Sequence, residues 1–211
     1  MKQNTAGKPP RRTQERTEVT RNKLLDAAAL LFTEQGFEGV SIRDLENEAE
    51  VQRGLLAYHF ADKESLWKAM ADRTFCLMLD ALSPRLEVLA DISPRERVAA
   101  IVRFYVRFSS QHPELPRLLS QEARHHSWRL KYLVDQHIAG TKEMLRAPVV
   151  EALGLSDQQF MHWYYFMAGA SSLIFSHAPE CELLFGTDPH ANEVVEAHAE
   201  MMVKALLGMA A

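Results

Sequence analysis

The stretch SIRDLENEAEVQRGLLAYH, residues 41–59, contains the signals for two short helices with a tight turn between them. Ser41 and Asp44 match a capping box, in which each side chain bonds to the backbone N–H of the other residue and starts a helix. We therefore expect one helix over residues 42–48 and a second over residues 52–60. Because only three residues separate them, the pair has the layout of a helix-turn-helix.

Helix signals recur along the rest of the chain, whereas alternating strand patterns are nearly absent. Ser93-Pro94-Arg95-Glu96 and Ser156-Asp157-Gln158-Gln159 are further N-terminal capping patterns. Ser83-Pro84 is expected to break or kink the helix that Asp62 opens. Apolar spacing and caps together predict an all-α protein of about nine helices, over residues 20–35, 42–48, 52–60, 62–83, 94–111, 114–124, 127–152, 157–176 and 188–207.

The chain has 211 residues, of which 47% are hydrophobic and 25% are charged, enough apolar mass for a sizeable core. The net charge of -4 excludes a protein coated in positive charge, but not a local basic segment. Residues 1–23 hold seven basic and two acidic side chains, and they include Pro9-Pro10. We expect a basic, flexible tail over residues 1–17.

Several classes of protein lack support in the sequence. The two cysteines cannot form a disulfide framework, and no secretory leader or membrane-length apolar run is visible, so a cytoplasmic location without membrane contact is expected. The nine histidines show no chelating pattern, and the motifs of hydrolases, nucleotide-binding proteins and metalloproteases are absent from the sequence. We expect no metal, no cofactor and no enzymatic activity.

The second short helix carries side chains that suit DNA. Gln52 and Arg53 open it, and in the major groove Gln pairs with adenine and Arg with guanine. Gly54 lets the backbone come close to a partner. Ser41 and Lys63 stand at helix N-termini, which attract phosphate, and the basic tail can follow the DNA backbone or enter a minor groove.

The competing interpretation is a plain helical hairpin whose polar side chains are merely solvated. Glu46, Glu48 and Glu50 favour it, because acidic side chains that faced a duplex would repel its phosphates.

Four segments resemble the N-terminal domain of TetR-type transcriptional repressors, in order and without gaps. They are TRNKLLDAA (20–28), FTEQGF (32–37), SIRDL (41–45) and YHFADKESL (58–66). The resemblance implies a three-helix DNA-binding domain over residues 18–64, a ligand-binding and dimerisation domain over 65–211, and a homodimer. Carried over by position, it implies that Gln52, Arg53 and Gly54 start the recognition helix, and that phosphate contacts come from Ser41, Arg43, Tyr58, His59 and Lys63.

Three residues depart from the family pattern. Glu50 stands where the turn usually has Gly, so a non-glycine residue is expected to adopt a left-handed or nearly left-handed backbone. Leu55 replaces a small polar residue, and contact with a thymine methyl is its expected role. Ala57 replaces a Tyr that often touches phosphate.

The C-terminal part is rich in aromatic residues, which favours an apolar pocket for a small molecule. Its expected lining is Phe104, Phe108, Trp128, Tyr132 and Phe166. Arg103, Arg107 and Glu122 are candidates for polar groups in it, although a solvated face suits each of them as well. The alternative for the aromatic residues is ordinary core packing.

The last two expected helices each carry an apolar stripe suited to a dimer interface. The small residues of AGASS, 168–172, permit close helix approach, and two such helices per subunit form a four-helix bundle across a two-fold axis. The alternative is burial of the stripes within one subunit. The expected interface residues are Phe160, Tyr164, Met167, Ser171, Ile174, Val194, His198, Met201 and Met202.

Taken together, these patterns predict a homodimeric regulator that binds a palindromic operator in double-stranded DNA. Release by a small-molecule effector, with the helix that begins near Asp62 as the lever, is the expected mode of action. The alternative is a DNA-binding protein of the same fold that is regulated by a protein partner or has no effector at all.

Overall fold

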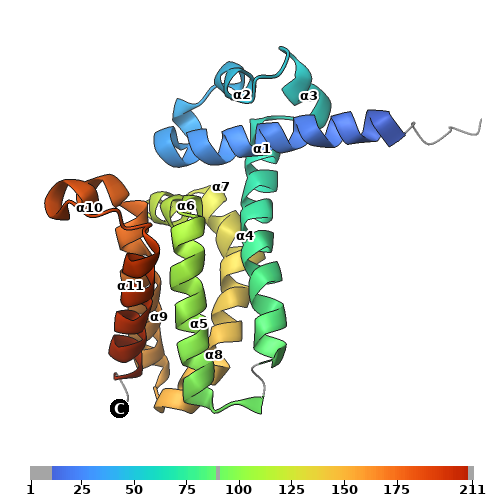
Figure 1. The fold of residues 1–211 in the computed structure, drawn as a ribbon. Coiled ribbons are helices and arrows are strands. Elements are labelled where there is room, and N and C mark those ends of the chain that lie inside the picture. The colour runs from blue at the N-terminus through green and yellow to red at the C-terminus, as the bar shows by residue number, and fades with distance from the viewer. Residues whose placement is uncertain (1–10, 89–90, 209–211) are drawn as a thin grey trace, which may run out of the picture. The chain divides into compact units, whose positions relative to one another are not determined.

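The computed structural model describes residues 11–88 and 91–208, and within those ranges it contains helices and no strand (Figure 1). The predicted all-α class is therefore confirmed. Contacts between residues divide the chain after Ala71 into two compact units. The division falls inside one long helix, α4 (Lys63–Val88), whose first nine residues belong to the first unit and whose remainder belongs to the second.

The first unit is a small helical domain. It consists of α1 (Arg11–Gly39), α2 (Ile42–Glu48), α3 (Leu55–His59) and the start of α4. Side chains from all four helices meet in one apolar core, among them Leu24, Leu25, Phe32, Leu45, Leu56, Leu66 and Trp67.

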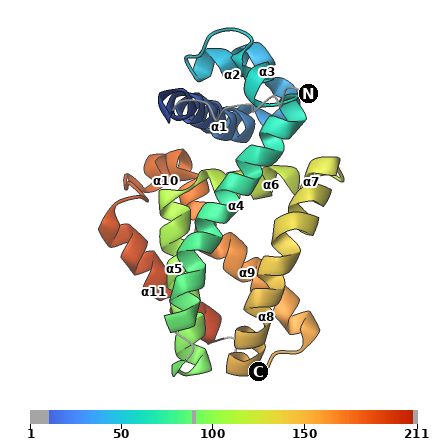
Figure 2. The same cartoon turned by 90° about the vertical axis from the view of Figure 1, so that its right-hand side faces the viewer.

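The second unit contains the rest of α4 and the remaining helices. They are α5 (Pro94–Gln111), α6 (Glu114–Glu122), α7 (Trp128–Leu133), the π-helix η2 (Val134–Ile138), α8 (Ala139–Leu153), α9 (Asp157–Ser176), α10 (Ala178–Phe185) and α11 (Asn192–Leu207). Helix α5 packs against α8, α9 and α11 (Figures 1 and 2). At the centre of this core, the buried Trp163 indole donates a 3.2 Å hydrogen bond to the Leu206 carbonyl.

Local capping signals predicted helix starts well. The boxes Ser41–Asp44, Ser93–Glu96 and Ser156–Gln159 are all formed, with both reciprocal hydrogen bonds. Each box satisfies N–H groups that the first turn of a helix otherwise leaves without a partner.

Two expectations near the N-terminus need correction. The flexible tail was expected to reach residue 17, but α1 already begins at Arg11, and residues 1–10 lie outside the described part. The second short helix begins at Leu55 and not at Gln52. Gly54, which immediately precedes it, has a φ of 89°, and that left-handed backbone cannot be part of a right-handed helix.

Two expectations in the C-terminal part also need correction. Of the break or kink expected at Ser83-Pro84, the break is absent, because α4 continues to Val88. The helix expected from Asp188 begins at Asn192, and the additional helix α10 precedes it. The helix expected over 127–152 is present as α7, η2 and α8, with one wider π turn in its middle.

No helix in residues 11–88 or 91–208 is both long and apolar enough to cross a membrane. The same described residues contain no group of three or more His, Cys, Asp or Glu side chains placed to hold a metal ion.

Candidate nucleic-acid interface

The predicted base-reading residues lie together on an exposed surface of the first unit. Gln52, Arg53 and Gly54 are exposed in the segment that leads into α3, and Arg43 is exposed on α2. Tyr58 on α3 leaves 73% of its surface accessible, although it is large and aromatic. Helices α2 and α3 contact each other, and α2 also packs on α1 (Figure 2). A compact helical domain thus presents one Gln, two Arg and one Tyr side chain on its surface.

The turn before these residues has the backbone that its sequence predicted. Glu50 has a φ of 53°, in the left-handed region that a non-glycine residue adopts at a cost of roughly 1–2 kcal/mol. Its side chain is exposed, with one carboxylate oxygen 3.9 Å from the Lys23 ammonium nitrogen. Glu50 therefore carries its charge on the surface, beside a basic residue of α1.

Glu46 takes a role that the sequence did not indicate. Its carboxylate oxygen Oε1 accepts hydrogen bonds from the backbone N–H groups of Gly54, at 2.7 Å, and Leu56, at 3.1 Å. The residue is only 4% exposed. Its charge is thus turned into the unit and does not oppose a duplex, in contrast to the hairpin interpretation. The contact spans eight to ten residues, beyond the reach of a local capping pattern.

Ser41 and Lys63 both have partners inside the unit. The Ser41 hydroxyl donates a 2.5 Å hydrogen bond to Asp44 Oδ2, and this hydrogen bond lowers the pKa of Asp44. The Lys63 ammonium donates to the carbonyls of Phe37, at 2.7 Å, and Val40, at 2.9 Å. It also lies 4.2 Å from the centre of the Phe37 ring. Lys63 therefore ties the end of α1 to the start of α4.

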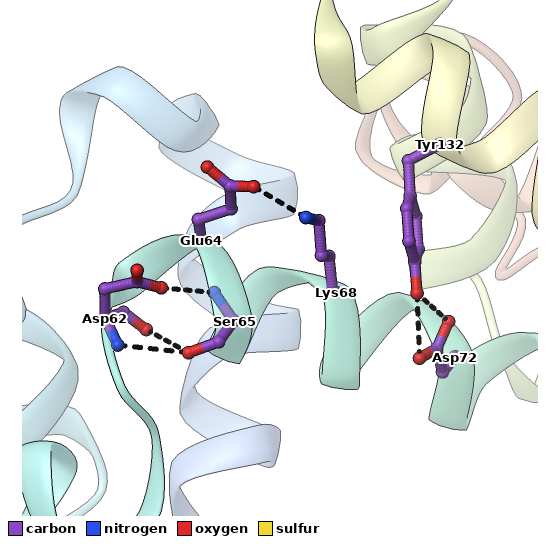
Figure 3. Close-up of polar contacts among 6 residues, drawn as sticks. All are labelled: Asp62, Glu64, Ser65, Lys68, Asp72 and Tyr132. Atoms are coloured by element: carbon purple, nitrogen blue, oxygen red, sulfur yellow. Dashed lines mark hydrogen bonds and ion pairs between the residues drawn. The ribbon is translucent and has the colours of Figure 1, made fainter.

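The N-terminus of α4 is occupied by acidic side chains (Figure 3). Asp62 Oδ1 accepts from the Ser65 N–H at 2.7 Å, and this hydrogen bond lowers the pKa of Asp62. Glu64 in the same turn pairs with Lys68 at 2.6 Å. Two carboxylates compete with a phosphate at this helix end, so the expected phosphate contact at Lys63 has little electrostatic support.

His59 is half-buried at the end of α3, where its ring contacts those of Tyr58 and Phe60. Burial, followed by the nearby Arg21 guanidinium, lowers the pKa of His59. The imidazole is therefore mostly neutral at pH 7, so any contact with phosphate is a single hydrogen bond without full charge. Leu55 is half-buried and Ala57 is exposed on the same short helix.

The predicted pocket aromatics do not all gather around one cavity. Phe104 lines a cavity of about 70 Å³ in the second unit. Phe108 is buried and stacks on a histidine, whereas Trp128 and Phe166 are partly exposed. Tyr132 donates its hydroxyl to Asp72 at 2.9 Å (Figure 3). Phe104 and Phe108, one turn apart on α5 with ring centroids 5.7 Å apart, line a groove of about 980 Å³ together with Arg103 and Arg107, whereas the other three aromatic residues lie outside it.

The cavity has a lining that the sequence pattern did not identify. It is formed by Phe75, Met78, Leu82, Ile101, Phe104, Tyr105, Leu115, Leu119, Ile138, Thr141, Leu145, Tyr164, Met167 and Ala168. None of these described residues is charged, and their polar groups are three hydroxyls. Burial raises the pKa of Tyr105, and it raises that of Tyr164 to about 12, so both hydroxyls stay neutral.

The three charged residues considered for this pocket have other partners. Arg103 pairs with Glu200 at 2.6 Å, and Arg107 pairs with Glu196 at 2.5 Å, both between α5 and α11. Glu122 is buried and bonds with Arg129 at 2.9 Å. These pairs join helices of the second unit.

The expected dimer stripes are largely used inside the chain. Phe160, Met167, Ser171 and Met202 are buried in the second unit's core, so they cannot form the surface that a partner meets. Tyr164, Ile174, Val194 and His198 are half-buried, and Met201 is exposed. The exposed apolar residues of these helices and of α10 share only Met201 with the expected set, and they are Met161, Tyr165, Phe166, Leu173, Leu183, Leu184, Phe185 and Met201.

Comparison with known proteins identifies the family. The model of the N-terminal domain of bacterial regulatory proteins of the tetR family matches residues 24–70, and that of the tetracyclin repressor-like C-terminal domain matches residues 94–206. The chain belongs to the TetR family. It is accordingly a DNA-binding transcriptional regulator, and the first match covers α2, its turn and α3.

Curated relatives of this TetR-family chain are named as regulators. It is 27% identical over 157 residues to the transcriptional repressor NicS of Pseudomonas putida. This match covers 71% of this chain and 72% of NicS. It is 24% identical over 146 residues to IcaR of Staphylococcus epidermidis, a negative regulator of a biofilm operon. This match covers 58% of this chain and 74% of IcaR.

Solved structures share the fold at low sequence identity. A TetR-like regulator from Rhodococcus sp. RHA1 superposes with a TM-score of 0.65 at 19% identity, over 95% of this chain and 97% of that one. FadR of Bacillus subtilis, solved with stearoyl-CoA, gives a TM-score of 0.66 at 12% identity, over 89% of this chain and 98% of FadR.

The internal hydrogen bonds of Lys63 lead to a first prediction. We expect Lys63→Met to lower the melting temperature, while the slope of log affinity against log salt for DNA stays unchanged. A side chain that contacts a phosphate contributes about 1 to that slope, and its removal lowers the slope by about that amount. Thermal unfolding and DNA titrations at several salt concentrations measure both effects, with exposed Arg43→Met as the control. A slope reduced in Lys63→Met would show that the ammonium binds phosphate after all.

Proposed function

We propose that this TetR-family chain is a homodimeric repressor that binds a palindromic operator and leaves it when a small uncharged molecule enters the second unit. The observation that carries the DNA part is the exposed Gln52-Arg53 pair just before the short helix α3, whose first turn is held by the buried Glu46. Arg and Gln are the side chains that read guanine and adenine edges by paired hydrogen bonds.

Two copies suit this mode of binding. A recognition helix reads one half-site, and a second copy reads another about one turn of duplex away, which makes the operator palindromic. The relatives named as a repressor and a negative regulator support repression over activation.

Exposed apolar side chains on α9, α10 and α11 support a dimer. Leu183 and Phe185 on α10 are 89% and 75% exposed. Leu173, Leu184 and Phe185 line a groove formed by residues of these three helices and the adjoining turns. Contiguous apolar side chains on a surface are typical of interfaces. We propose that the second copy of this chain covers them, in place of the buried stripe expected from the sequence.

The cavity of the second unit supports an uncharged effector. A charged ligand buried there would lose its hydration without gaining an opposite charge, because the described lining holds only apolar groups and neutral hydroxyls. Tyr105, Thr141 and Tyr164 are available to orient one polar group of an apolar molecule. FadR of B. subtilis is solved with stearoyl-CoA, and its phosphate-bearing ligand differs from the class that this lining accepts.

A hydrogen-bonded cluster next to the cavity supplies a path to α4. Asp72 on α4 accepts from the Tyr132 hydroxyl at 2.9 Å and lies 2.8 Å from His137 Nε2. Phe75, one turn further along α4, stacks on the His137 ring at 4.4 Å and also lines the cavity. Burial and the adjacent Asp72 raise the pKa of Tyr132 to about 12, so its hydroxyl remains a donor.

An effector that fills the cavity touches Phe75 and Ile138, the latter next to His137 in the chain. Displacing either one shifts groups that hold Asp72 of α4, and α4 continues into the DNA-binding unit. A hundredfold loss of DNA affinity requires that the effector binds the released form about 2.7 kcal/mol more tightly.

One observation favours the alternative of regulation without a small molecule. Pockets for drug-sized ligands usually measure about 300–1,000 Å³, and this cavity measures about 70 Å³. An effector must therefore be small or must widen the cavity. If neither occurs, the chain acts as a DNA-binding regulator controlled by a protein partner or by its own concentration.

The test of the DNA proposal is selection of sequences from a random duplex pool by the full chain. We expect a palindrome to be enriched, and Gln52→Ala/Arg53→Ala to bind it at least about tenfold more weakly while keeping its non-specific affinity, since each good base contact is worth about 1–3 kcal/mol. Competition titrations against unrelated duplex measure the ratio. Equal specificity in the double variant would place base recognition elsewhere.

The proposed dimer surface is tested by charge insertion. We expect Leu173→Asp/Phe185→Asp to weaken self-association at least about tenfold, because two carboxylates would be buried against an apolar partner. Sedimentation equilibrium gives the dissociation constant. Met144→Asp, which changes an exposed apolar residue on α8, is the control. Dimers of unchanged strength in the double variant would rule out this surface.

The effector proposal predicts which compounds release DNA. In fluorescence anisotropy of the chain on its selected duplex, we expect small uncharged apolar molecules to cause release, and fatty acids or acyl-CoA esters to have no effect. Ala168→Leu fills part of the cavity, and we expect it to bind DNA normally while losing the response. If the Ala168→Leu variant still left its DNA duplex at the same compound concentrations as the wild type, the effector site would lie outside this cavity.

A further inference from the structure

The start of α3 carries backbone N–H groups that need acceptors. The first four N–H groups of a helix have no carbonyl partner within that helix. Helix α3 has only five residues, too few to be stable by itself. Its N-cap residue is Gly54, and glycine has no side chain with which to cap a helix. The position of α3 therefore depends on an acceptor from elsewhere.

Glu46 supplies that acceptor from α2. Its Oε1 atom receives the Gly54 N–H at 2.7 Å and the Leu56 N–H at 3.1 Å, one on either side of the first helical residue. Hydrogen bonds to an ionised carboxylate are stronger than neutral ones, and a negative charge suits the N-terminal end of the helix dipole. With 4% of the residue exposed, water does not compete strongly for the carboxylate.

The two hydrogen bonds hold the backbone directly after the base-reading side chains. Gln52 and Arg53 directly precede the Gly54 N–H that Glu46 holds. On the other side, the Leu56 side chain is buried in the core and its N–H is held by the same oxygen. The segment 54–56 is thus attached to α2 at both ends, directly after Gln52 and Arg53.

We propose that Glu46 is a positioning residue for base recognition, which sets the place and direction of Gln52 and Arg53 without touching DNA. This inference rests on the proposed function of those two residues. It assigns the most deeply buried acid of the helix-turn-helix a role in specificity. Glu48, an exposed acidic residue of the same helix, has no such role.

The first experiment compares Glu46→Gln and Glu46→Ala with the matched control Glu48→Gln in the full chain. The probe is the duplex enriched by the wild-type protein, with an unrelated duplex of equal length for non-specific binding. We expect specific affinity to fall about tenfold or more in Glu46→Ala and by a smaller factor in Glu46→Gln, which keeps an acceptor oxygen but loses the charge. Non-specific affinity, which depends on surface cations, should change less than about twofold.

A general loss of folding would lower both affinities together, so their ratio separates positioning from instability. Thermal unfolding of each variant shows how much folded protein is present. If Glu46→Ala does not fold, the isosteric Glu46→Gln still carries the test, because only the charge and one acceptor oxygen differ. A specificity ratio in folded Glu46→Gln equal to that of the wild type and of Glu48→Gln would overturn the inference.

A second readout needs no DNA. Hydrogen exchange followed by NMR reports the amide protons of Gly54 and Leu56, and we expect both to exchange about tenfold faster in Glu46→Ala, with Glu48→Gln unchanged. Unchanged protection of both amides would show that Glu46 does not hold the segment.

If the wild-type chain enriches no sequence, the proposed function fails and this inference with it. If the wild type enriches a sequence and the Glu46 variants bind it with unaltered specificity, only the inference about Glu46 fails and the proposed function stands.

Discussion

Helix α4 is the element that both units of this protein require. Its first turns contribute Leu66 and Trp67 to the core of the DNA-binding unit, and its later turns contribute Phe75 and Met78 to the cavity of the second unit. A helix cannot change the spacing of its residues without breaking backbone hydrogen bonds, so a force on one turn is carried along the axis. The effect of the cavity on DNA binding that we propose uses this continuous segment as its path.

The contacts of the acidic residues explain how a chain of net charge -4 can bind DNA. Several carboxylates are engaged within the structure and are not spread over the recognition surface. Glu46 caps α3, Asp62 caps α4, and Glu122 pairs with Arg129 in the second unit. In the DNA-binding unit, burial of Glu46 removes one carboxylate from the surface that carries Gln52 and Arg53, while Glu50 stays exposed near Lys23. Net charge alone therefore says little about the local field that a phosphate meets.

Features that depend on neighbouring residues were predictable from the sequence. The capping boxes at Ser41, Ser93 and Ser156 act over three residues, and all three form as expected. The left-handed backbone of Glu50 followed from the family resemblance, because Glu50 stands where the family usually has Gly. By contrast, the bond from Glu46 to Leu56 spans ten residues and depends on how α2 and α3 pack. No local pattern distinguishes Glu46 from Glu48, which is exposed.

The cavity and the surface of α9 show the same limit at longer range. Aromatic content predicted an apolar pocket, but only Phe104 of the five expected residues lines the cavity, because which side of a helix faces inward is set by the helices packed around it. On α9, Phe160, Trp163 and Met167 fill the core, while Met161, Tyr165 and Leu173 face outward. A helix that is apolar on nearly every side has no polar face to mark the solvent.

The sequence of α9 could therefore not tell which stripe the chain buries within itself. The structure assigns one stripe to the core and leaves the other exposed, next to Leu184 and Phe185 of α10. Apolar area left in water is unfavourable at about 25 cal/mol per Å². A surface on which three helices contribute such area is stabilised when a partner covers it, and a second copy of the same chain brings an equal apolar surface. The proposed self-association through this face would also join two DNA-binding units, as the proposed palindromic operator requires.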